Sequence, residues 1–257
     1  MKYGIVSDLS FIINPPFLQN SIELLKSNRI INIGIHLNFT MGKPLNSGVT
    51  SLSDFKGDFN TTSKHFSNYL FSKLDPAEIY KEGKTQIEIL LSNGFNITHF
   101  DTHQNIHILL PFFKVISKLR DAYCPNAFIR FPNEQIGLPI GYKFSNWKRM
   151  FLLNTFTGRL LTKKEDEKTI QTIGGDFYNN EHPKKVFQKV LDGIGSSVHE
   201  SFELAVHPGF ISDDIAGFDS YISGREIEFQ FLSQSNSLIE KHNIKLINFN
   251  ELILVNN

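Results

Sequence analysis

The sequence predicts an α/β fold with a mostly parallel sheet. Short apolar runs typical of buried strands alternate along the chain with stretches that have helical period. Such alternation is typical of parallel strands joined by right-handed helical crossovers. A second observation is that three apolar runs end on a histidine and then break into loop-forming residues, at His36, His103 and His207. Because α/β enzymes gather their sites at the carboxyl ends of strands, the sequence favours an enzyme.

The expected elements follow one another in order. Strands are predicted at 7–14, 28–39, 96–103, 127–132, 203–209 and 244–249. Helices are predicted within 15–28, 75–94, 110–123, 182–195 and 223–243, because apolar residues there recur with helical spacing. The stretch from about 133 to 180 is less regular, and its Trp147 and Phe-rich run predict a cap over one end of the fold. No repeat or low-complexity linker divides the chain, so one domain spanning 1–257 is expected.

Composition narrows the classes of partner and environment. The chain has 26 Lys and Arg against 26 Asp and Glu, a balance that favours neither nucleic acid nor an anionic membrane as partner. The only cysteine, Cys124, excludes an internal disulfide and a cysteine-rich zinc site, and we expect it to be a buried spectator. The sequence shows no leader pattern and no apolar run of about 18 residues, so a soluble, cytoplasmic protein is expected.

Strand alternation sorts the side chains around the histidines. In the strand predicted at 28–39, the aliphatic residues share one face and His36 lies on the other. Asp101 and His103 share one face of the following strand, and His207 ends a later one. A lone histidine is more often a core or surface residue with a satisfied ring nitrogen. Three histidines at strand ends, one with a carboxylate two residues away, favour a shared site.

Metal-assisted hydrolysis is the chemistry that such a set suggests. Neutral imidazoles are the commonest metal ligands, and an ion held by two histidines and a carboxylate keeps open positions for water and substrate. A divalent ion polarises a carbonyl and lowers the pKa of bound water, so amides can be hydrolysed near neutral pH. A histidine outside the coordination shell can protonate the leaving amine.

Several segments together resemble the signature blocks of a known family. The blocks are GIHLNFTMGKPL, SLSDFKGDF, THFDTHQNIHILLP, IRFPNE, AVHPGF, DSYISGREIEFQFL and IKLINFNEL. In this order, over nearly the whole chain, they are similar to the blocks of the YdjC-like family, the chitooligosaccharide deacetylase group of carbohydrate deacetylases.

The resemblance implies a fold, a reaction and a set of site residues. The implied fold is a distorted TIM-like (β/α) barrel, and the implied reaction removes the acetyl group from an N-acetylated sugar. The implied cofactor is a divalent ion, magnesium or alternatively zinc, with His36 and His103 as metal ligands. By the same resemblance His207 is the general acid, and Arg130 lies in the strand whose arginine lines the substrate pocket.

The chain also departs from the family pattern. Family members open with a strand that ends in Asp-Asp-Phe-Gly, whose aspartates supply a metal ligand and the catalytic base, and the chain starts where that strand should be finished. The first strand of the barrel is therefore expected to be missing, and its absence would expose backbone groups that a homodimer could cover. Asn105 also stands where the family often has histidine. Asp101 is the better candidate for the vacant carboxylate or for orienting a ligand ring, and Asp8 is the weaker one.

Two other functions remain open at this point. A catalytically impaired sugar-binding or regulatory relative would keep the barrel and the histidines but lack the base. A different metal-dependent amidohydrolase would normally show a His-x-His pair on its first strand, and the sequence has no such pair there.

Two further residues are predicted to line the substrate site. His107 falls in the loop or first helical turn after the third strand, since Pro111 argues against one helix through this region, and a pocket wall is expected there. Phe39 is expected to contact a sugar ring, although ordinary core packing is the commoner role of a single aromatic residue among 24 Phe.

Overall fold

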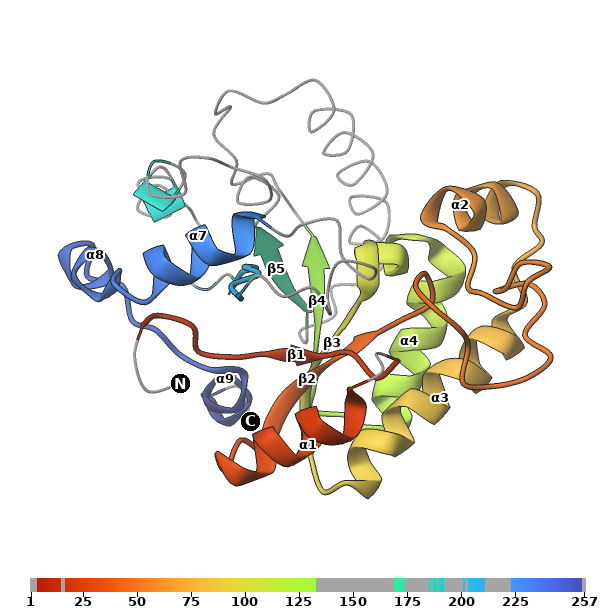
Figure 1. The fold of residues 1–257 in the computed structure, drawn as a ribbon, viewed down its shortest axis with the longest axis horizontal. Coiled ribbons are helices and arrows are strands. Elements are labelled where there is room, and N and C mark those ends of the chain that lie inside the picture. The colour runs from red at the N-terminus through yellow and green to blue at the C-terminus, as the bar shows by residue number, and fades with distance from the viewer. Residues whose placement is uncertain are drawn as a thin grey trace. The chain divides into compact units, whose positions relative to one another are not determined.

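The computed structural model describes residues 4–14, 17–132, 169–173, 185, 187–188, 190–191, 201, 203–210 and 223–255 (Figure 1). The chain divides into two compact units, each of which is described by itself. The amino-terminal unit comprises Asp8–Arg130, Glu165–Thr169 and Phe249–Asn257. The carboxy-terminal unit comprises Met1–Ser7, Phe131–Lys164 and Ile170–Asn248.

Parallel strands in sequence order form the sheet of the amino-terminal unit (Figure 1). They are β1 (Ser10–Phe11), β2 (Asn32–Leu37), β3 (Asn96–Thr102) and β4 (Phe128–Pro132), of which Phe128–Arg130 belong to this unit. Its helices are α1 (Leu18–Ser27), α2 (Thr62–Leu70), α3 (Pro76–Ser92), the 3-10 helix η1 (His103–Ile108), α4 (Leu110–Tyr123) and α9 (Phe249–Val255). Helices alternate with parallel strands, as the sequence predicts.

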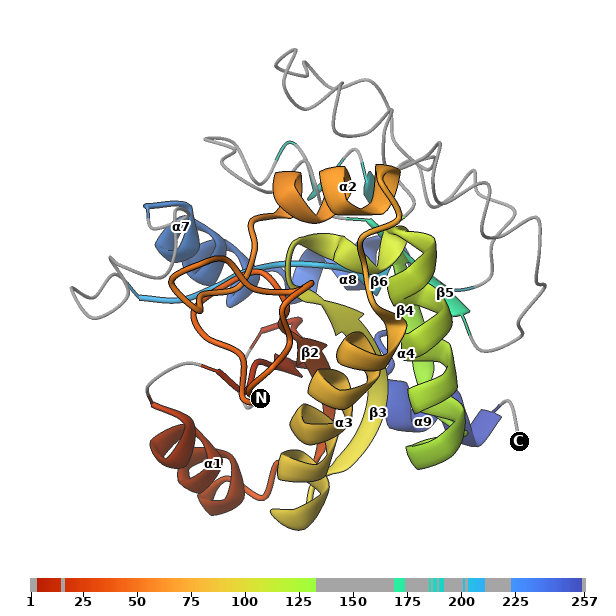
Figure 2. The same cartoon turned by 90° about the vertical axis from the view of Figure 1, so that its right-hand side faces the viewer.

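The two faces of β2 differ in chemistry. Ile33, Ile35 and Leu37 are fully buried in the core, whereas His36 on the opposite face is partly exposed. Helix α3 packs against α4 and contacts β2 and β3, and Figure 2 shows α3 and α4 side by side next to these strands. The apolar stripe therefore builds the core, and the other face is left for polar side chains.

The strand register fixes which polar residues become neighbours. Ser10 pairs with Gly34, and His36 pairs with Asp101. A register irregularity between Ile33 and Gly34 sets the second pairing. At the start of β4, His99 pairs with Phe128 and Phe100 with Ile129, which brings Arg130 beside Asp101. All four strands thus contribute a polar residue to one region of the sheet.

The carboxy-terminal unit contains the parallel pair β5 (Thr169–Ile173) and β6 (Glu203–Leu204), with β5 counted from Ile170 in this unit. The hydroxyl of Thr172 donates to Oε2 of Glu203 over 2.7 Å. Helices α7 (Ser223–Leu232) and α8 (Asn236–Lys241) follow. Phe187, Leu191 and Ile239 form a buried apolar cluster in this unit.

Most predicted elements are confirmed, with local differences. The strands predicted at 7–14 and 203–209 are reduced to Ser10–Phe11 and Glu203–Leu204. The helix predicted within 182–195 lies largely outside the described residues. Helix α4 has the predicted bounds, while the segment at 223–243 forms two helices with a break. The strand predicted at 244–249 is wrong, because 244–248 are irregular and α9 begins at Phe249. Of the predicted cap at 133–180, Thr169–Ile173 are described and form β5, and Trp147 lies outside the described residues. Helix α2 was not predicted.

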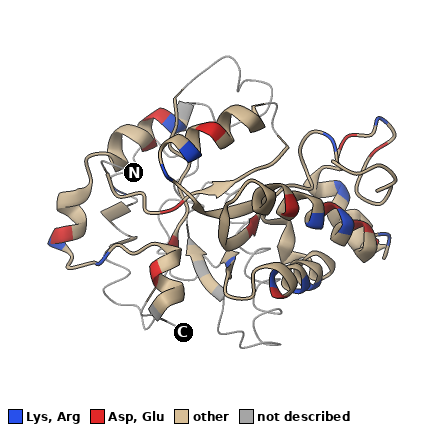
Figure 3. Cartoon of the chain, turned by 90° about the horizontal axis from the view of Figure 1, so that it is seen from below, with Lys and Arg blue, Asp and Glu red and all other residues tan. Residues whose placement is uncertain are grey.

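Charged residues of both signs are interspersed along the helices in the view of Figure 3. One such pair is Lys84 and Glu88 on α3, whose charged atoms lie 3.6 Å apart. Among the described residues, no helix is long and apolar enough to cross a membrane.

Candidate active site

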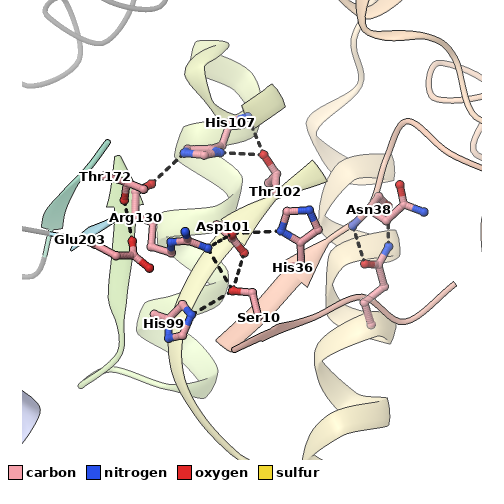
Figure 4. Close-up of polar contacts among 11 residues, drawn as sticks. Ser10, His36, Asn38, His99, Asp101, Thr102, His107, Arg130, Thr172 and Glu203 are labelled. Carbon is pink, nitrogen blue, oxygen red and sulfur yellow. Dashed lines mark hydrogen bonds and ion pairs between the residues drawn. The ribbon is translucent and has the colours of Figure 1, made fainter. Parts of the chain in front are cut away.

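A buried carboxylate, Asp101, lies at the centre of a polar network drawn from all four strands of the amino-terminal unit (Figure 4). Its Oδ2 lies 3.0 Å from Nδ1 of His36 on β2 and also contacts Nη1 of Arg130 on β4. Its Oδ1 accepts a hydrogen bond of 3.1 Å from the hydroxyl of Ser10 on β1. Four segments that are distant in sequence therefore converge on one carboxylate.

The Ser10 hydroxyl determines the tautomer of His99. Because Ser10 gives its only proton to Asp101, the 2.9 Å contact between Ser10 Oγ and Nε2 of His99 requires that His99 be the donor. Nδ1 of a neutral His99 then accepts from the Thr98 hydroxyl at 3.0 Å. Nη1 of Arg130 also donates to Ser10 Oγ over 3.3 Å. Ser10 thus uses one donor and two acceptor positions, and His99 is neutral.

Electrostatics keep the charges of this network fixed. Burial by itself raises the pKa of Asp101, but the interactions with His36 and Arg130 outweigh it and hold the pKa well below its usual range. Burial lowers the pKa of His99 to about 3, and the nearby charge of Arg130 acts in the same direction. Near neutral pH the network therefore contains an ionised carboxylate and a neutral His99 ring.

Gly34 is required for the packing of the His99 ring. A Cβ atom at position 34 would lie 2.0 Å from Nε2 of His99, where no side chain fits. On the α9 side the ring stacks on Phe249, with centroids 4.0 Å apart. His99 is thus held between the backbone of β2 and the first residue of α9.

Asp8, the weaker carboxylate candidate, also lies at this helix. Both of its carboxylate oxygens lie 3.2 Å from the backbone nitrogen of Phe249, at the start of α9. A negative charge at a helix amino terminus is stabilising. The contact gives Asp8 a structural role at α9.

His36 and His103 form an adjacent pair of rings at the ends of β2 and β3. Their centroids lie 5.8 Å apart, and the rings are inclined at 75°. Nδ1 of His103 lies 2.6 Å from the hydroxyl oxygen of Thr40, just as Nδ1 of His36 lies beside Asp101. The side chain of His36 is 27% exposed, so a ligand can reach it. Each ring contacts the protein through Nδ1, and a metal would therefore be bound through Nε2.

The turn after β2 places Thr40 against His103. Oδ1 of Asn38 accepts from the backbone nitrogens of Thr40 and Met41, and its Nδ2 donates to the Met41 carbonyl over 2.7 Å. The side-chain amide of Gln86 on α3 pairs with both backbone groups of Asn38, at 2.9 and 2.7 Å. Asn38 therefore folds the chain back so that a hydroxyl reaches His103.

A second turn, directly after His103, has an unusual backbone. Gln104 and Asn105 have φ values of 56° and 53° and lie in the left-handed region, which non-glycine residues adopt at a cost. The hydroxyl of Thr62, the first residue of α2, contacts Oε1 of Gln104. Such strain is typical of functional sites, because the surrounding structure must hold it in place.

His107 is placed differently from the prediction of a pocket wall. The residue is only 1% exposed, and its Nε2 donates to the carbonyl of Arg130 over 2.8 Å. Nδ1 then accepts from the hydroxyl of Thr102 at 2.6 Å. Burial lowers the pKa of His107 to about 4. The ring ties the end of β3 to β4, and it offers no surface to a substrate here.

Phe39 is likewise a core residue, in contrast to the predicted sugar contact. Its side chain is fully buried, and its ring packs edge-on against Phe112 with centroids 5.2 Å apart. Nε2 of His65 donates to the Phe39 carbonyl over 2.8 Å. The aromatic ring has no exposed face on which a sugar could stack.

His207 belongs to the carboxy-terminal unit and is described there by itself. The residue is exposed, and its backbone nitrogen donates to Oε2 of the buried Glu228. Its carbonyl accepts from Nη1 of Arg225 over 3.2 Å. Two residues of α7 thus hold the His-Pro-Gly segment, and the predicted role of His207 as proton donor stays a prediction.

Sequence reasoning missed Ser10 and Thr40, which give the cluster its geometry. No sequence pattern marks either residue, since isolated Ser and Thr residues are common throughout protein surfaces. His99 lies on the same face of β3 as Asp101 by strand alternation, and no role was predicted for it. Burial also raises the pKa of Cys124 to about 11, as expected of a thiol without catalytic activation.

The ring pair is compatible with a shared ion, although the described residues contribute no third ligand of the common types. An ion bound at about 2.1 Å lies about 3.2 Å from each ring centroid, so two rings that share it lie within about 6.5 Å of each other. The observed separation is 5.8 Å. Within the described ranges no group of three or more His, Cys, Asp or Glu could hold a metal. His36 and His103 alone would supply protein ligands from this part of the chain.

The fold and the site together define an α/β protein with a cluster of histidines and a carboxylate at its strand ends. The family model of YdjC-like proteins matches residues 1–238, and the chain belongs to this family. The family resemblance seen in the sequence blocks is thereby confirmed.

Similar proteins and a solved structure support this assignment. A carbohydrate deacetylase from Clostridium beijerinckii is 27% identical over 256 residues, which cover 98% of this chain and 90% of that protein. A carbohydrate deacetylase from Listeria monocytogenes is 27% identical over 257 residues, with the same coverage of both chains. A crystal structure from Enterococcus faecalis, described as a cellobiose-phosphate cleavage protein, has a TM-score of 0.74 at 23% identity and covers 97% of this chain and 88% of that chain. This likeness confirms the predicted fold class.

Proposed function

We propose that this chain is a hydrolase that removes the acetyl group from an N-acetylated sugar. Relatives named carbohydrate deacetylase match 98% of the chain and support this class of reaction. The observation that carries the proposal is the paired arrangement of His36 and His103. Each ring has a polar partner at Nδ1, the Asp101 carboxylate for His36 and the Thr40 hydroxyl for His103, and such partners commonly orient histidines that bind a metal.

A divalent ion held by His36 and His103 is part of the proposal. Bound there, it would act as a Lewis acid toward the acetyl carbonyl and the attacking water. Imidazole nitrogens suit zinc and other transition ions, whereas magnesium prefers oxygen ligands. The donor pair thus favours zinc over the magnesium implied by the family resemblance.

The contacts of Asp101 favour a positioning role over that of general base. A base works best when its pKa lies near the working pH, and the pKa of Asp101 lies far below it. The carboxylate also contacts three partners, His36, Arg130 and Ser10. Asp101 would hold the proton of His36 on Nδ1 and so present Nε2 to the ion.

The proton donor to the leaving amine is proposed to be His207, as the family resemblance implies. Arg130 is proposed to act on the substrate side through its contact with Asp101, which fixes the guanidinium group on β4. A cytoplasmic location and a homodimer also stay predictions.

Acetate release from N-acetylglucosamine oligomers tests the proposal, with metal content measured on the same samples. The expected result is turnover that depends on an added divalent ion, and substitution of His36 or His103 by alanine should remove both metal and turnover. Lys118→Ala, on the exposed side of α4, is the matched control and should keep both.

The alternative is a sugar-binding relative without turnover. It would bind the same oligomers and release no acetate under any metal condition, and this outcome would replace the proposed reaction.

A further inference from the structure

An open cavity of about 500 Å³ lies in the amino-terminal unit, on α2 and the loop before it. Its lining includes Phe55, Asn60, Lys64, Asn68 and Lys73. None of these belongs to the histidine cluster, by which we mean His36, Asp101 and His103. The volume falls within the range of sites that bind small molecules, about 300 to 1,000 Å³.

Two buried asparagines give the cavity its acceptor groups. Asn60 and Asn68 are 4% and 7% exposed, and both donate through Nδ2 to the carbonyl of Ser51, at 3.1 and 3.2 Å. A carbonyl oxygen only accepts, so these contacts assign the amide orientation of both side chains. Within the described part of the chain neither Oδ1 has a hydrogen-bond partner, and both residues line the cavity. Two oriented acceptors are therefore offered to a ligand.

The remaining walls supply donors and an apolar face. Lys64 and Lys73 are exposed lysines of the lining, and among the described residues neither forms a salt bridge. Phe55 is 93% exposed, so its ring is open to contact with a ligand. Asp54 also lines the cavity, but its Oδ1 is used by the backbone nitrogens of Lys56 and Asp58.

We propose that this cavity is a binding site for a hexopyranose unit, separate from the histidine cluster. A sugar ring carries hydroxyl groups that both donate and accept, and it carries an apolar face that packs on an aromatic ring. Asn60 and Asn68 would accept from hydroxyl groups, Lys64 and Lys73 would donate to them, and Phe55 would cover the apolar face. A carbohydrate has all three properties.

The segment that carries the cavity is hydrogen-bonded to the surroundings of His103. His65, between Lys64 and Asn68 on α2, donates to the carbonyl of Phe39, next to Thr40. Thr62 contacts Gln104, next to His103. Sugar binding at this cavity does not depend on the proposed deacetylase function. A role of the cavity in selecting oligosaccharide substrates over single sugars would rest on that function.

Binding of cellobiose, measured by titration calorimetry, tests the site independently of the reaction because cellobiose has no acetyl amide. We expect saturable binding to the full chain and a shift of the side-chain amide NMR signals of Asn60 and Asn68. Phe55→Ala and Lys64→Ala should each weaken binding by about tenfold, the equivalent of one lost aromatic or polar contact. Neither substitution removes a buried group, so both variants should fold.

Matched controls separate this site from the histidine cluster. Phe17→Ala and Lys114→Ala remove an exposed aromatic and an exposed lysine outside the cavity, and His36→Ala disables the cluster; all three should leave cellobiose binding unchanged. Absence of binding, or binding unaffected by the Phe55 and Lys64 substitutions, overturns the proposal. Binding of inorganic phosphate without binding of cellobiose overturns it in favour of an anion site. Cellobiose binding without acetate release would instead contradict the deacetylase function alone.

Discussion

Asp101 and His36 are partners in the register of β3 and β2, and Oδ2 of the first lies 3.0 Å from Nδ1 of the second. Arg130 contacts the same oxygen, and His36 and Arg130 together hold the pKa of the carboxyl group well below its usual range. The orientation of His36 therefore depends on a charge that is buried in the sheet and shared by three strands.

Replacing Asp101 with asparagine should lower both the free energy of unfolding and the affinity for a metal ion. The amide removes the charge that faces Arg130, and loss of one partner from a buried ion pair costs about 3 to 5 kcal/mol in the free energy of unfolding. Loss of the orienting carboxylate should also lower metal affinity by about 10 to 100-fold. Urea unfolding and metal titration measure the two effects. The control Glu88→Gln breaks a surface pair and should change stability by less than about 0.5 kcal/mol.

Thr40→Val should weaken metal binding while the fold is kept. Valine has nearly the shape of threonine but lacks the hydroxyl that contacts Nδ1 of His103. We expect metal affinity to fall by about tenfold, because the ring loses its orienting partner. Thr85→Val removes a hydroxyl with partners on α3 and in the preceding loop, and it serves as the control for metal titration. Equal affinities in both variants would contradict the role of Thr40.

Gly34→Ala should destabilise the protein through His99. The added methyl group would overlap the His99 ring, and overpacking of this kind typically costs about 1 to 3 kcal/mol. A double-mutant cycle with His99→Ala isolates the clash. If the mechanism is correct, Gly34→Ala will be tolerated far better in the His99→Ala background, and simple additivity of the two unfolding free energies would exclude it.

Stability should fall as the pH is lowered from 6.5 toward 4. The folded pKa values of His99 and His107 are lowered to about 3 and about 4, so the unfolded chain takes up protons first. The contribution of these two histidines to the free energy of unfolding is fully present above the unfolded pKa of about 6.5. It is lost as the pH falls below that value, by up to about 1.4 kcal/mol per pH unit for each histidine.

Asp101 does not contribute to that loss. Its folded pKa is lowered, so its contribution is present above its unfolded value of 3.8 and is lost only in stronger acid. Urea unfolding at pH 7, 6 and 5 measures how steeply the free energy of unfolding changes with pH. His107→Gln should reduce this slope by the equivalent of about one proton taken up on unfolding. A slope unchanged in this variant would show that His107 is not the buried, neutral ring described above.

The sequence alone predicted the alternation of elements, because buried strands and amphipathic helices differ in the period of their apolar residues. Helix α4 followed the prediction to the residue, since its pattern is long and strong. The short strand β5 and helix α2 were missed because their patterns are short. Strand ends also identified His36, Asp101 and His103 as neighbours, because side-chain alternation and parallel pairing need no further information.

Only the tertiary structure decided how these residues are held and which others take part. Ser10 and Thr40 reach the cluster through a strand register and a turn, and no local pattern marks either residue. The same packing removed Phe39 and His107 from the candidate substrate contacts, because both side chains are buried. Sequence period fixes which face of an element a side chain occupies, whereas exposure, tautomer and pKa depend on neighbours that are brought close only when distant segments pack.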